Sequence, residues 1–186
     1  MAGRRAAGTT VAQAWVELTT ADPEAVSALA VARAHLPSGR TLRSLRRLRL
    51  FELSGALPPR AGLESLIHRS IQFYNPHKER CAVRVAAADP APVTAEECVV
   101  LVFERGEERR SGAEQWWRHE TGGEVVVREG VAWALRFEPG VRDAMATAEE
   151  LAVLRDRRHG LLCNPHAQEH RVGAGKIPLP WMTDRA

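Results

Sequence analysis

Apolar residues alternate in some stretches of the chain and recur every three or four positions in others, which predicts a mixture of strands and helices. Alternation over residues 11–18 is typical of a half-buried strand. Residues 22–39 begin with Asp-Pro-Glu and end at glycine, so they predict a capped helix with one apolar stripe. The pattern of basic and apolar residues over 43–53 predicts a basic strand. Because Arg47 and Arg49 interrupt its apolar face, we expect a bulge or an exposed edge there.

The rest of the chain continues this alternation of elements. The remaining expected elements are a helix over 63–70, a strand ending at Val85, a strand over 98–103, a short helix over 113–119, a β-hairpin over 125–137 turning at Glu129-Gly130, and a helix over 141–152. The strand over 98–103 is apolar on both faces, so it is expected inside a sheet. Each half therefore runs strand, helix, strand or hairpin, helix, strand. This predicts an α+β fold of two ferredoxin-like units in tandem, each of the β-α-β-β-α-β type and related by a pseudo-twofold axis.

Composition suggests where the two units begin and end. The expected segments are a flexible arm over 1–10, a first unit over 11–88, an Ala/Pro-rich linker over 89–96, a second unit over 97–172 and a Pro-rich tail over 173–186. Residues 1–92 hold 13 basic and 7 acidic residues, whereas residues 93–186 hold 13 and 16. The halves thus carry opposite net charges and attract each other weakly.

A short motif occurs twice, 89 positions apart. Asn75, Pro76 and His77 recur as Asn164, Pro165 and His166. Proline fixes its own φ, lacks an N–H and pushes the preceding residue away from the helical region. Each Asn-Pro is therefore expected to end a helix and to begin an edge strand or a bulged strand. The repeat suggests two related units, each closed by the same turn.

Composition bounds the class of protein. Hydrophobic residues make up 45% and charged residues 26% of the 186 residues, as in ordinary globular proteins. Three cysteines are an odd number without framework spacing, so we expect reduced thiols in a cytoplasmic protein. The basic N-terminus is not followed by the apolar run of a secretory signal. No stretch approaches the roughly 20 apolar residues that span a bilayer.

Histidines and cysteines offer one spacing that could suit zinc. His159, Cys163, His166 and His170 would share one face of a continuous helix. Gly160 and Pro165 oppose such a helix, because both disfavour helix interiors. His77 and Cys81 would share one face of a strand. Surface polar residues after a turn remain the simpler interpretation of His77 and His166, so no metal site is predicted.

No group of residues forms a recognisable acid–base or nucleophile–base set, so we expect a non-enzyme without catalytic residues or cofactor. The glycines at 173 and 175 lack the spacing of a phosphate-binding loop. Among the aromatic residues, Trp133 is expected in the core, and one of Trp116 and Trp117 is expected to be buried. Trp181 lies in the Pro-rich tail, where we expect no core for it to enter, so it could serve protein contact.

The arginines from Arg40 to Arg49 form the strongest basic cluster. A strand edge protected by charge is the simplest interpretation. The alternatives are a docking surface for an acidic protein, with Arg46, Arg47 and Arg49 as docking charges, and a nucleic-acid surface. Nucleic acid is less favoured, because no aromatic side chains interleave with the arginines as single-strand binders require.

Several short motifs resemble the small subunit of phosphoribosylformylglycinamidine synthase (PurS). Leu161-Leu162-Cys163-Asn164-Pro165 is similar to the family's run before its last strand, and Phe73-Tyr74-Asn75-Pro76 is a looser copy. Asp22-Pro23 stands where the family has Asp-Pro at its first helix. Residues 46–53 resemble its basic second strand. The family's glycine after Asp-Pro is absent, its glycine in the second strand is Leu48 here, and the second half lacks Asp-Pro.

The resemblance implies a non-catalytic protein that joins the synthetase subunit to the ammonia-supplying glutaminase subunit in purine biosynthesis. PurS forms dimers, so a tandem fusion would place both halves of such a dimer in one chain, and further self-association is possible. The two Asn-Pro-His turns would then border the partner contacts. The alternatives from other classes are a tandem ACT-like domain that senses a small amino acid or nucleotide between its halves, and a basic RNA-binding protein.

Overall fold

The computed structural model describes residues 10–106 and 109–182. Its elements are β1 (Thr10–Leu18), α1 (Pro23–His35), a 3-10 turn (Ser38–Thr41), β2 (Leu42–Gly55), α2 (Arg60–His68), β3 (Glu79–Arg84), β4 (Glu97–Glu104), α3 (Ser111–Thr121), β5 (Val125–Phe137), α4 (Ala144–Ala152) and β6 (Gln168–Ala174). The arm expected over 1–10 lies, apart from Thr10, outside the described residues. The last four residues of the expected tail also lie outside them.

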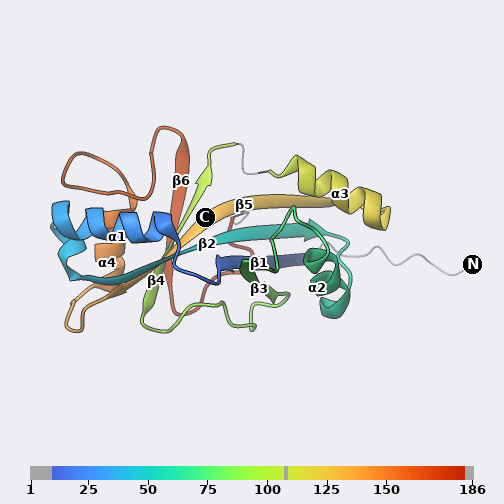
Figure 1. Cartoon of the computed structure of the whole chain (residues 1–186), viewed down its shortest axis with the longest axis horizontal. Helices are drawn as coiled ribbons and strands as arrows, with labels where there is room; N and C mark the ends of the chain where they lie inside the picture. Colours follow the sequence, from blue (N-terminus) through green and yellow to red (C-terminus); the bar gives the residue numbers. More distant parts are fainter. Residues whose placement is uncertain (1–9, 107–108, 183–186) are drawn as a thin grey trace, which may run out of the picture.

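The strands form one six-stranded antiparallel sheet in the order β3-β1-β2-β5-β4-β6, so the protein has an α+β fold (Figure 1). The long strands β2 and β5 pair at its centre, where Arg49 lies opposite Val131. The first half of the chain, β1 to β3, supplies one side of the sheet, and the second half, β4 to β6, supplies the other. In each half the first strand lies between the other two.

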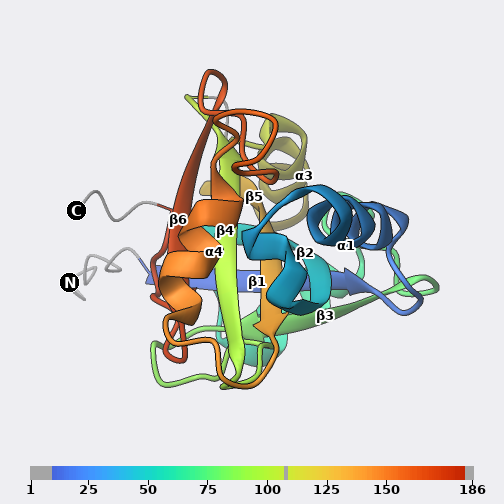
Figure 2. The same ribbon diagram turned by 90° about the vertical axis from the view of Figure 1, so that its left-hand side faces the viewer.

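The helices cover one face of the sheet in two pairs, and each pair takes one helix from each half (Figures 1 and 2). Helices α1 and α4 bury Ala32 and Leu151 against β4 and β5. Helices α2 and α3 bury Leu63 and Trp117 against β1 and β2. The two halves therefore share their apolar layers. Asp22 fixes the start of α1, because its carboxylate accepts the N–H groups of the first turn, at 2.8 and 3.3 Å.

The opposite face of the sheet is covered by irregular segments. Part of the linker between β3 and β4 contributes Ala91 and Val93, and the tail after β6 contributes Ile177 and Trp181. The expectation that Trp181 has no core to enter is wrong. The side chain is only 4% exposed and stacks on Trp15, with 6.3 Å between the ring centroids. Trp133 and Trp117 are buried as predicted, and Trp116 is partly buried.

The expected hairpin over 125–137 is also wrong. These residues form the single strand β5, because β2 pairs with it along its whole length. Gly130 is not a turn residue. A Cβ atom there would lie 2.9 Å from Leu101 Cδ1 and 3.0 Å from the carbonyl oxygen of Val102, so glycine lets β4 approach closely. Each half has three described strands and two described helices, not the four strands of a β-α-β-β-α-β unit.

The basic strand is not an exposed edge. Strand β2 pairs with β1 on one side and β5 on the other, and its register irregularity lies between Leu42 and Ser44. Its arginines are tolerated at the centre of the sheet because carboxylates pair with them. The prediction that residues 98–103 form an interior strand is confirmed, since β4 pairs with both β5 and β6.

Candidate functional site

The two Asn-Pro-His turns make the same hydrogen bonds. The Asn75 side-chain oxygen accepts the backbone N–H of His77 at 3.0 Å, and the Asn164 side-chain oxygen accepts that of His166 at 3.1 Å. Each asparagine carbonyl accepts the N–H groups three and four positions later, at 2.8–3.2 Å. This is the local bonding that asparagine offers a turn, and proline blocks the helical alternative. The turns lead into β3 and β6, the two edge strands of the sheet.

A side chain at the fourth position after each asparagine closes the turn. Glu79 accepts the backbone N–H of Asn75 at 2.7 Å, and Gln168 accepts that of Asn164 at 2.9 Å. We call the segments 75–79 and 164–168 the first and second corner. Our sequence reasoning did not single out Glu79 or Gln168. The signal was present, because the shift that aligns the two asparagines also aligns these two hydrogen-bonding residues.

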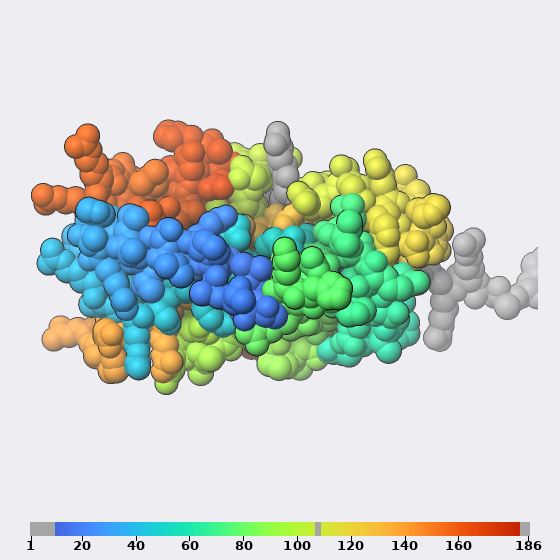
Figure 3. All heavy atoms as spheres, in the orientation of Figure 1, coloured from blue at the N-terminus to red at the C-terminus, as the bar shows by residue number. Residues whose placement is uncertain are grey.

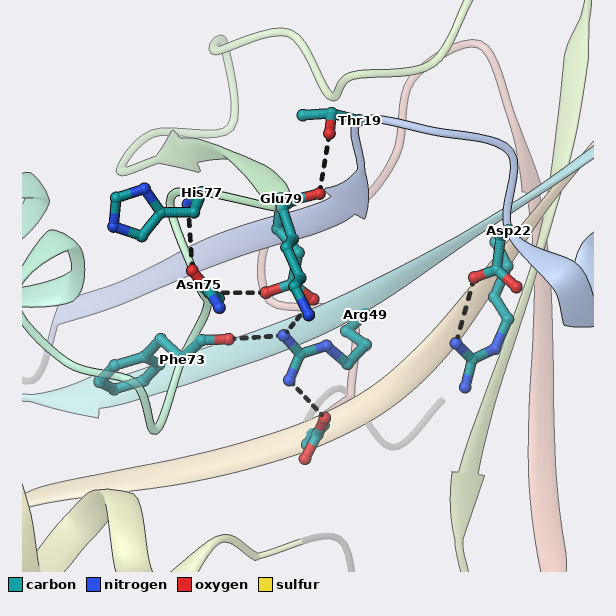
Figure 4. Close-up of polar contacts among 10 residues, drawn as sticks. Thr19, Asp22, Arg49, Phe73, Asn75, His77 and Glu79 are labelled. Carbon is teal, nitrogen blue, oxygen red and sulfur yellow. Dashed lines mark hydrogen bonds and ion pairs between the residues drawn. The ribbon is translucent and has the colours of Figure 1, made fainter.

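The first corner is bound to the centre of the sheet through Arg49 (Figure 4). The Arg49 guanidinium donates to the Glu79 carboxylate and to the Phe73 carbonyl, both at 2.9 Å. It also lies 3.8 Å from the carboxylate of Glu129 on β5, which pairs with Arg110 at 2.7 Å. A chain of alternating charges thus runs from the first corner to the second half of the protein.

The second corner has a different partner. The Gln168 amide donates to the Glu104 carboxylate, at the end of β4, at 2.8 Å. An amide takes the place of the carboxylate of Glu79, so this corner has no counterpart of the Glu79–Arg49 ion pair. The two corners share their backbone geometry but differ in charge.

A cleft of about 400 Å³ lies near the middle of the helix-bearing face. Its walls include the side chains of Arg47, Glu104, Arg110, Glu129, Trp133 and Gln168. In the space-filling view, α1 lies on one side of the central region, and α2 and α3 lie on the other (Figure 3). Residues from both halves of the chain line the cleft, and the second corner contributes through Gln168. Such a mixture of aromatic and charged walls suits a small polar ligand with a flat or apolar part.

Arg47 and Trp133 form one wall of this cleft. The Arg47 guanidinium lies over the Trp133 ring, 5.9 Å from its centroid, and pairs with Asp22 at 3.4 Å and Glu24 at 3.0 Å. Trp133 also borders a second, more apolar hollow of about 390 Å³ between α1 and Leu162. The Asp-Pro-Glu sequence at the start of α1 therefore both caps the helix and holds a cleft arginine in place.

The three arginines proposed as docking charges do not share one surface. Arg47 and Arg49 lie on the helix-bearing face, but Arg46 belongs to the opposite face and pairs with Glu17 at 2.8 Å and Glu97 at 3.0 Å. The hydrogen bond with Glu97 raises the pKa of Arg46, although burial opposes the rise. Burial alone would raise the pKa of Glu97, but the bonds from Arg46 and the N–H of Thr94 lower it. These arginines are already paired within the chain.

The corner residues proposed as partner contacts are accessible. Asn75, Pro76, His77, Asn164 and His166 are exposed, and Pro165 is partly exposed. The first corner lies beside Arg49, whereas the second corner lies beside Glu104. The structure therefore joins one docking arginine to one corner and leaves the other corner without one.

Two of the histidines considered as zinc ligands have other partners. His159 contacts Asp156 at 3.0 Å, and His170 contacts Glu149 at 2.6 Å. Within residues 10–106 and 109–182, no three His, Cys, Asp or Glu side chains are grouped as metal ligands. Burial raises the pKa of all three cysteine thiols, that of Cys81 to about 12, which disfavours the reactive thiolate.

Comparisons of the chain with protein-family models, with curated proteins and with solved structures find no match. Among the described helices, none combines the length and the apolar character that a membrane crossing requires. The features of the chain that bear on its function are therefore the corners, the cleft and the motifs themselves.

Proposed function

We propose that the chain is a non-catalytic bridging subunit of phosphoribosylformylglycinamidine synthase, formed by the tandem fusion of two PurS-like units. In this role it joins the synthetase and glutaminase subunits in the cytoplasm during purine biosynthesis. The observation that carries the proposal is the pair of corners, in which the PurS-like sequence before each proline makes the same turn with the same hydrogen bonds.

Contacts beyond the corners support a duplicated unit. The backbone N–H of Thr19 donates to the carbonyl of Lys78 at 2.9 Å, and the N–H of Arg105 donates to that of Ala167 at the same distance. Both bonds join the end of a half's first strand to its corner. The pairing of α1 with α4 and of α2 with α3 also supports the idea of a dimer held in one chain. Each pair joins a helix of one half to a helix of the other, so each half completes the apolar layer of the other.

The proposed mechanism is positional. The corners lead into edge strands at opposite sides of the sheet, so a partner at each edge would lie on a different side of the same rigid support. The difference in charge between Glu79 and Gln168 lets the two edges prefer different partners. The bridged subunits would stay close enough for ammonia to pass from one to the other without escaping to solvent.

Reconstitution with the synthetase and glutaminase subunits of the same cell tests this proposal. We expect a ternary complex on size-exclusion chromatography and glutamine-dependent synthase activity only when all three proteins are present. Activity with added ammonia should need the synthetase but not the bridge, which controls for an intact synthetase. If neither subunit binds the chain, the proposal is wrong.

Variants of the exposed corner histidines give a sharper test. We expect His77→Glu to weaken one partner and His166→Glu to weaken the other, because the corners lie at different edges. Both side chains are exposed, so the thermal stability should stay close to that of the wild type. Equal loss of both partners in each variant would contradict a separate role for each corner.

The central cleft favours a second candidate, a ligand-sensing function of the ACT-like kind. Its walls come from both halves, and they combine Trp133 with paired charges. A thermal-shift screen with amino acids and nucleotides distinguishes this role, since a bridge needs no small molecule. Stabilisation that disappears in Trp133→Leu would support it.

The ion pairs of Arg46, Arg47 and Arg49 argue against the RNA-binding alternative, because phosphate binding needs cations that are not already neutralised.

A further inference from the structure

The tail after β6 leaves the second half of the chain and lies across the face of the sheet that carries no helices. Ile177, Trp181 and Met182 are buried there at 2–5% exposure against apolar residues of both halves, including Trp15 and Leu101. Gly173 makes room for this path. A Cβ at that position would lie 3.3 Å from both the Ile177 side chain and the Trp181 ring.

A buried carboxylate holds the end of this segment by its backbone. Oε2 of Glu52 accepts the N–H of Trp181 at 2.6 Å and that of Met182 at 3.2 Å. The Gln13 amide donates to the same oxygen at 3.2 Å and to the Pro178 carbonyl at 3.1 Å. Neither Glu52 nor Gln13 is exposed at all. These contacts recognise main-chain groups rather than the side chains of the tail.

Two arginines bind the carbonyl groups of the same segment. Arg84, 2% exposed, donates to the Ile177 carbonyl at 3.0 Å and to the Gln13 side-chain oxygen at 2.6 Å. Arg171 donates to the carbonyls of Trp181 and Met182. The face thus offers both an acceptor and donors to the backbone of a bent, irregular segment, and Trp15 stacks on its Trp181. In peptide recognition, main-chain hydrogen bonds give affinity and pockets for side chains give specificity.

Glu52, Gln13 and Arg84 belong to the first half, whereas Arg171 belongs to β6 of the second. Glu52 pairs with Gln13 across β2 and β1, whereas the corresponding pair across β5 and β4 is Ala134 and Val99. The buried main-chain groups of the tail need polar partners, but neutral side chains such as that of Gln13 could supply them, whereas burying charged groups costs solvation. Charged groups become hydrated when the cover leaves, which lowers the free energy of the open state. The choice of Glu52 and Arg84 therefore favours a cover that can detach.

We propose that this face is a peptide-binding groove, filled in the isolated chain by residues 175–182 and able to exchange them for a segment of a partner protein. The partner segment has the chemistry of the tail: a bent, irregular backbone, with proline preceding an aromatic residue and two successive backbone N–H groups for Glu52. The tail then acts as an intramolecular competitor whose high effective concentration keeps the groove closed until the partner is present. This proposal does not depend on the bridging role.

Native-state hydrogen exchange on the unaltered full chain is the first test. A detachable tail opens locally, so the amides of Trp181 and Met182 should exchange at least 100-fold faster than that of Leu50 in the central strand β2. Exchange of all three amides at one common rate, set by global unfolding, would show that the tail is a fixed part of the core and would overturn the proposal.

The second test uses the full-length Trp181→Ala variant, in which the tail is weakened, and a labelled peptide of residues 174–182. Anisotropy should report binding at least tenfold tighter to this variant than to the wild type, whose own tail competes. The double variant Trp181→Ala/Glu52→Gln should bind at least tenfold more weakly than Trp181→Ala, and a peptide with alanine in place of tryptophan should not bind. Peptide binding that does not depend on Glu52 would refute the proposed groove. So would the lack of peptide binding to a folded Trp181→Ala chain. Circular dichroism checks folding, and if the variants unfold, the exchange experiment still decides.

Discussion

The Arg49 guanidinium donates to the Glu79 carboxylate at 2.9 Å, which joins the central strand of the sheet to the corner that opens an edge strand. Glu79 also accepts the backbone N–H of Asn75, so one carboxylate both closes the turn and ties it to the sheet. The second corner keeps the closure but has the neutral Gln168 in that place. This difference separates the contribution of the turn from that of the ion pair.

Glu79→Gln should lower the free energy of unfolding by about 1–2 kcal/mol, since the amide retains an acceptor for Asn75 but loses the partly buried ion pair. The reciprocal change, Gln168→Glu, places a carboxylate beside Glu104 at an exposed site and should cost about 0.5–1 kcal/mol. Urea denaturation measures both values. A double-mutant cycle with Arg49→Met isolates the pair, and a coupling energy near zero would show that Arg49 contributes nothing through Glu79.

Stability should fall on acidification partly because of Glu97, which is 4% exposed and paired with Arg46. Burial opposes ionisation, but the Arg46 pair and the Thr94 N–H outweigh it and lower the pKa of Glu97 below its ordinary value of 4.5. A carboxylate with a lowered folded-state pKa stabilises the fold above its unfolded value, and this contribution is lost as the pH falls through the folded value. Glu97→Gln should therefore be about 1–3 kcal/mol less stable at pH 7.

The difference in the free energy of unfolding between the wild type and Glu97→Gln should shrink steadily as the pH falls below 4.5, because protonated Glu97 and glutamine are then both neutral. Chemical denaturation between pH 3 and pH 7 measures this convergence. Glu150→Gln, on the exposed surface of α4, is the matched control and should change stability little at any pH in that range. A stability difference between Glu97→Gln and the wild type that stays constant with pH would contradict the role given to ionised Glu97.

Gly160 should tolerate no side chain. Its φ is +79°, and a Cβ would lie 1.6 Å from the carbonyl oxygen of Val153, so Gly160→Ala forces the loop after α4 to move. We expect a loss of more than about 3 kcal/mol. Gly122 ends α3 with a φ of +69° and no atom within 4 Å of such a Cβ, so Gly122→Ala should cost only about 1 kcal/mol. Equal melting temperatures for the two variants would be incompatible with this geometry.

The cysteines should be unreactive in the native protein. Cys98 and Cys163 are buried, and desolvation of the partly exposed Cys81 raises its pKa to about 12, so the thiol stays protonated at any pH used for labelling. Reaction with a disulfide reagent at pH 8 should be at least 100-fold slower than in denaturant. Rapid modification, located by mass spectrometry, would contradict the burial of Cys98 or Cys163, or the raised pKa of Cys81.

Part of the site could be predicted from the sequence because its chemistry is local. The turns at Asn75 and Asn164 follow from Asn-Pro itself, and the helix start at Asp22 follows from Asp-Pro-Glu. The partners of Arg49 could not be predicted, since Glu79 and Glu129 reach it only through strand register. The alternation of a strand already places Arg46 on the face opposite Arg47, but its partners Glu17 and Glu97, on β1 and β4, could not be predicted for the same reason.

The order of strands and helices along the chain is largely a property of local sequence, because apolar periodicity and proline act within a few residues. Which strands become neighbours is decided by contacts between distant residues. Strand β5 stays unbroken through Glu129-Gly130 because β2 supports its whole length, and Trp181 enters a core because Glu52, far away in sequence, binds its backbone. Local rules therefore determine the elements and the two corners, whereas burial and long-range pairing determine the sheet, the cleft and the place of Trp181.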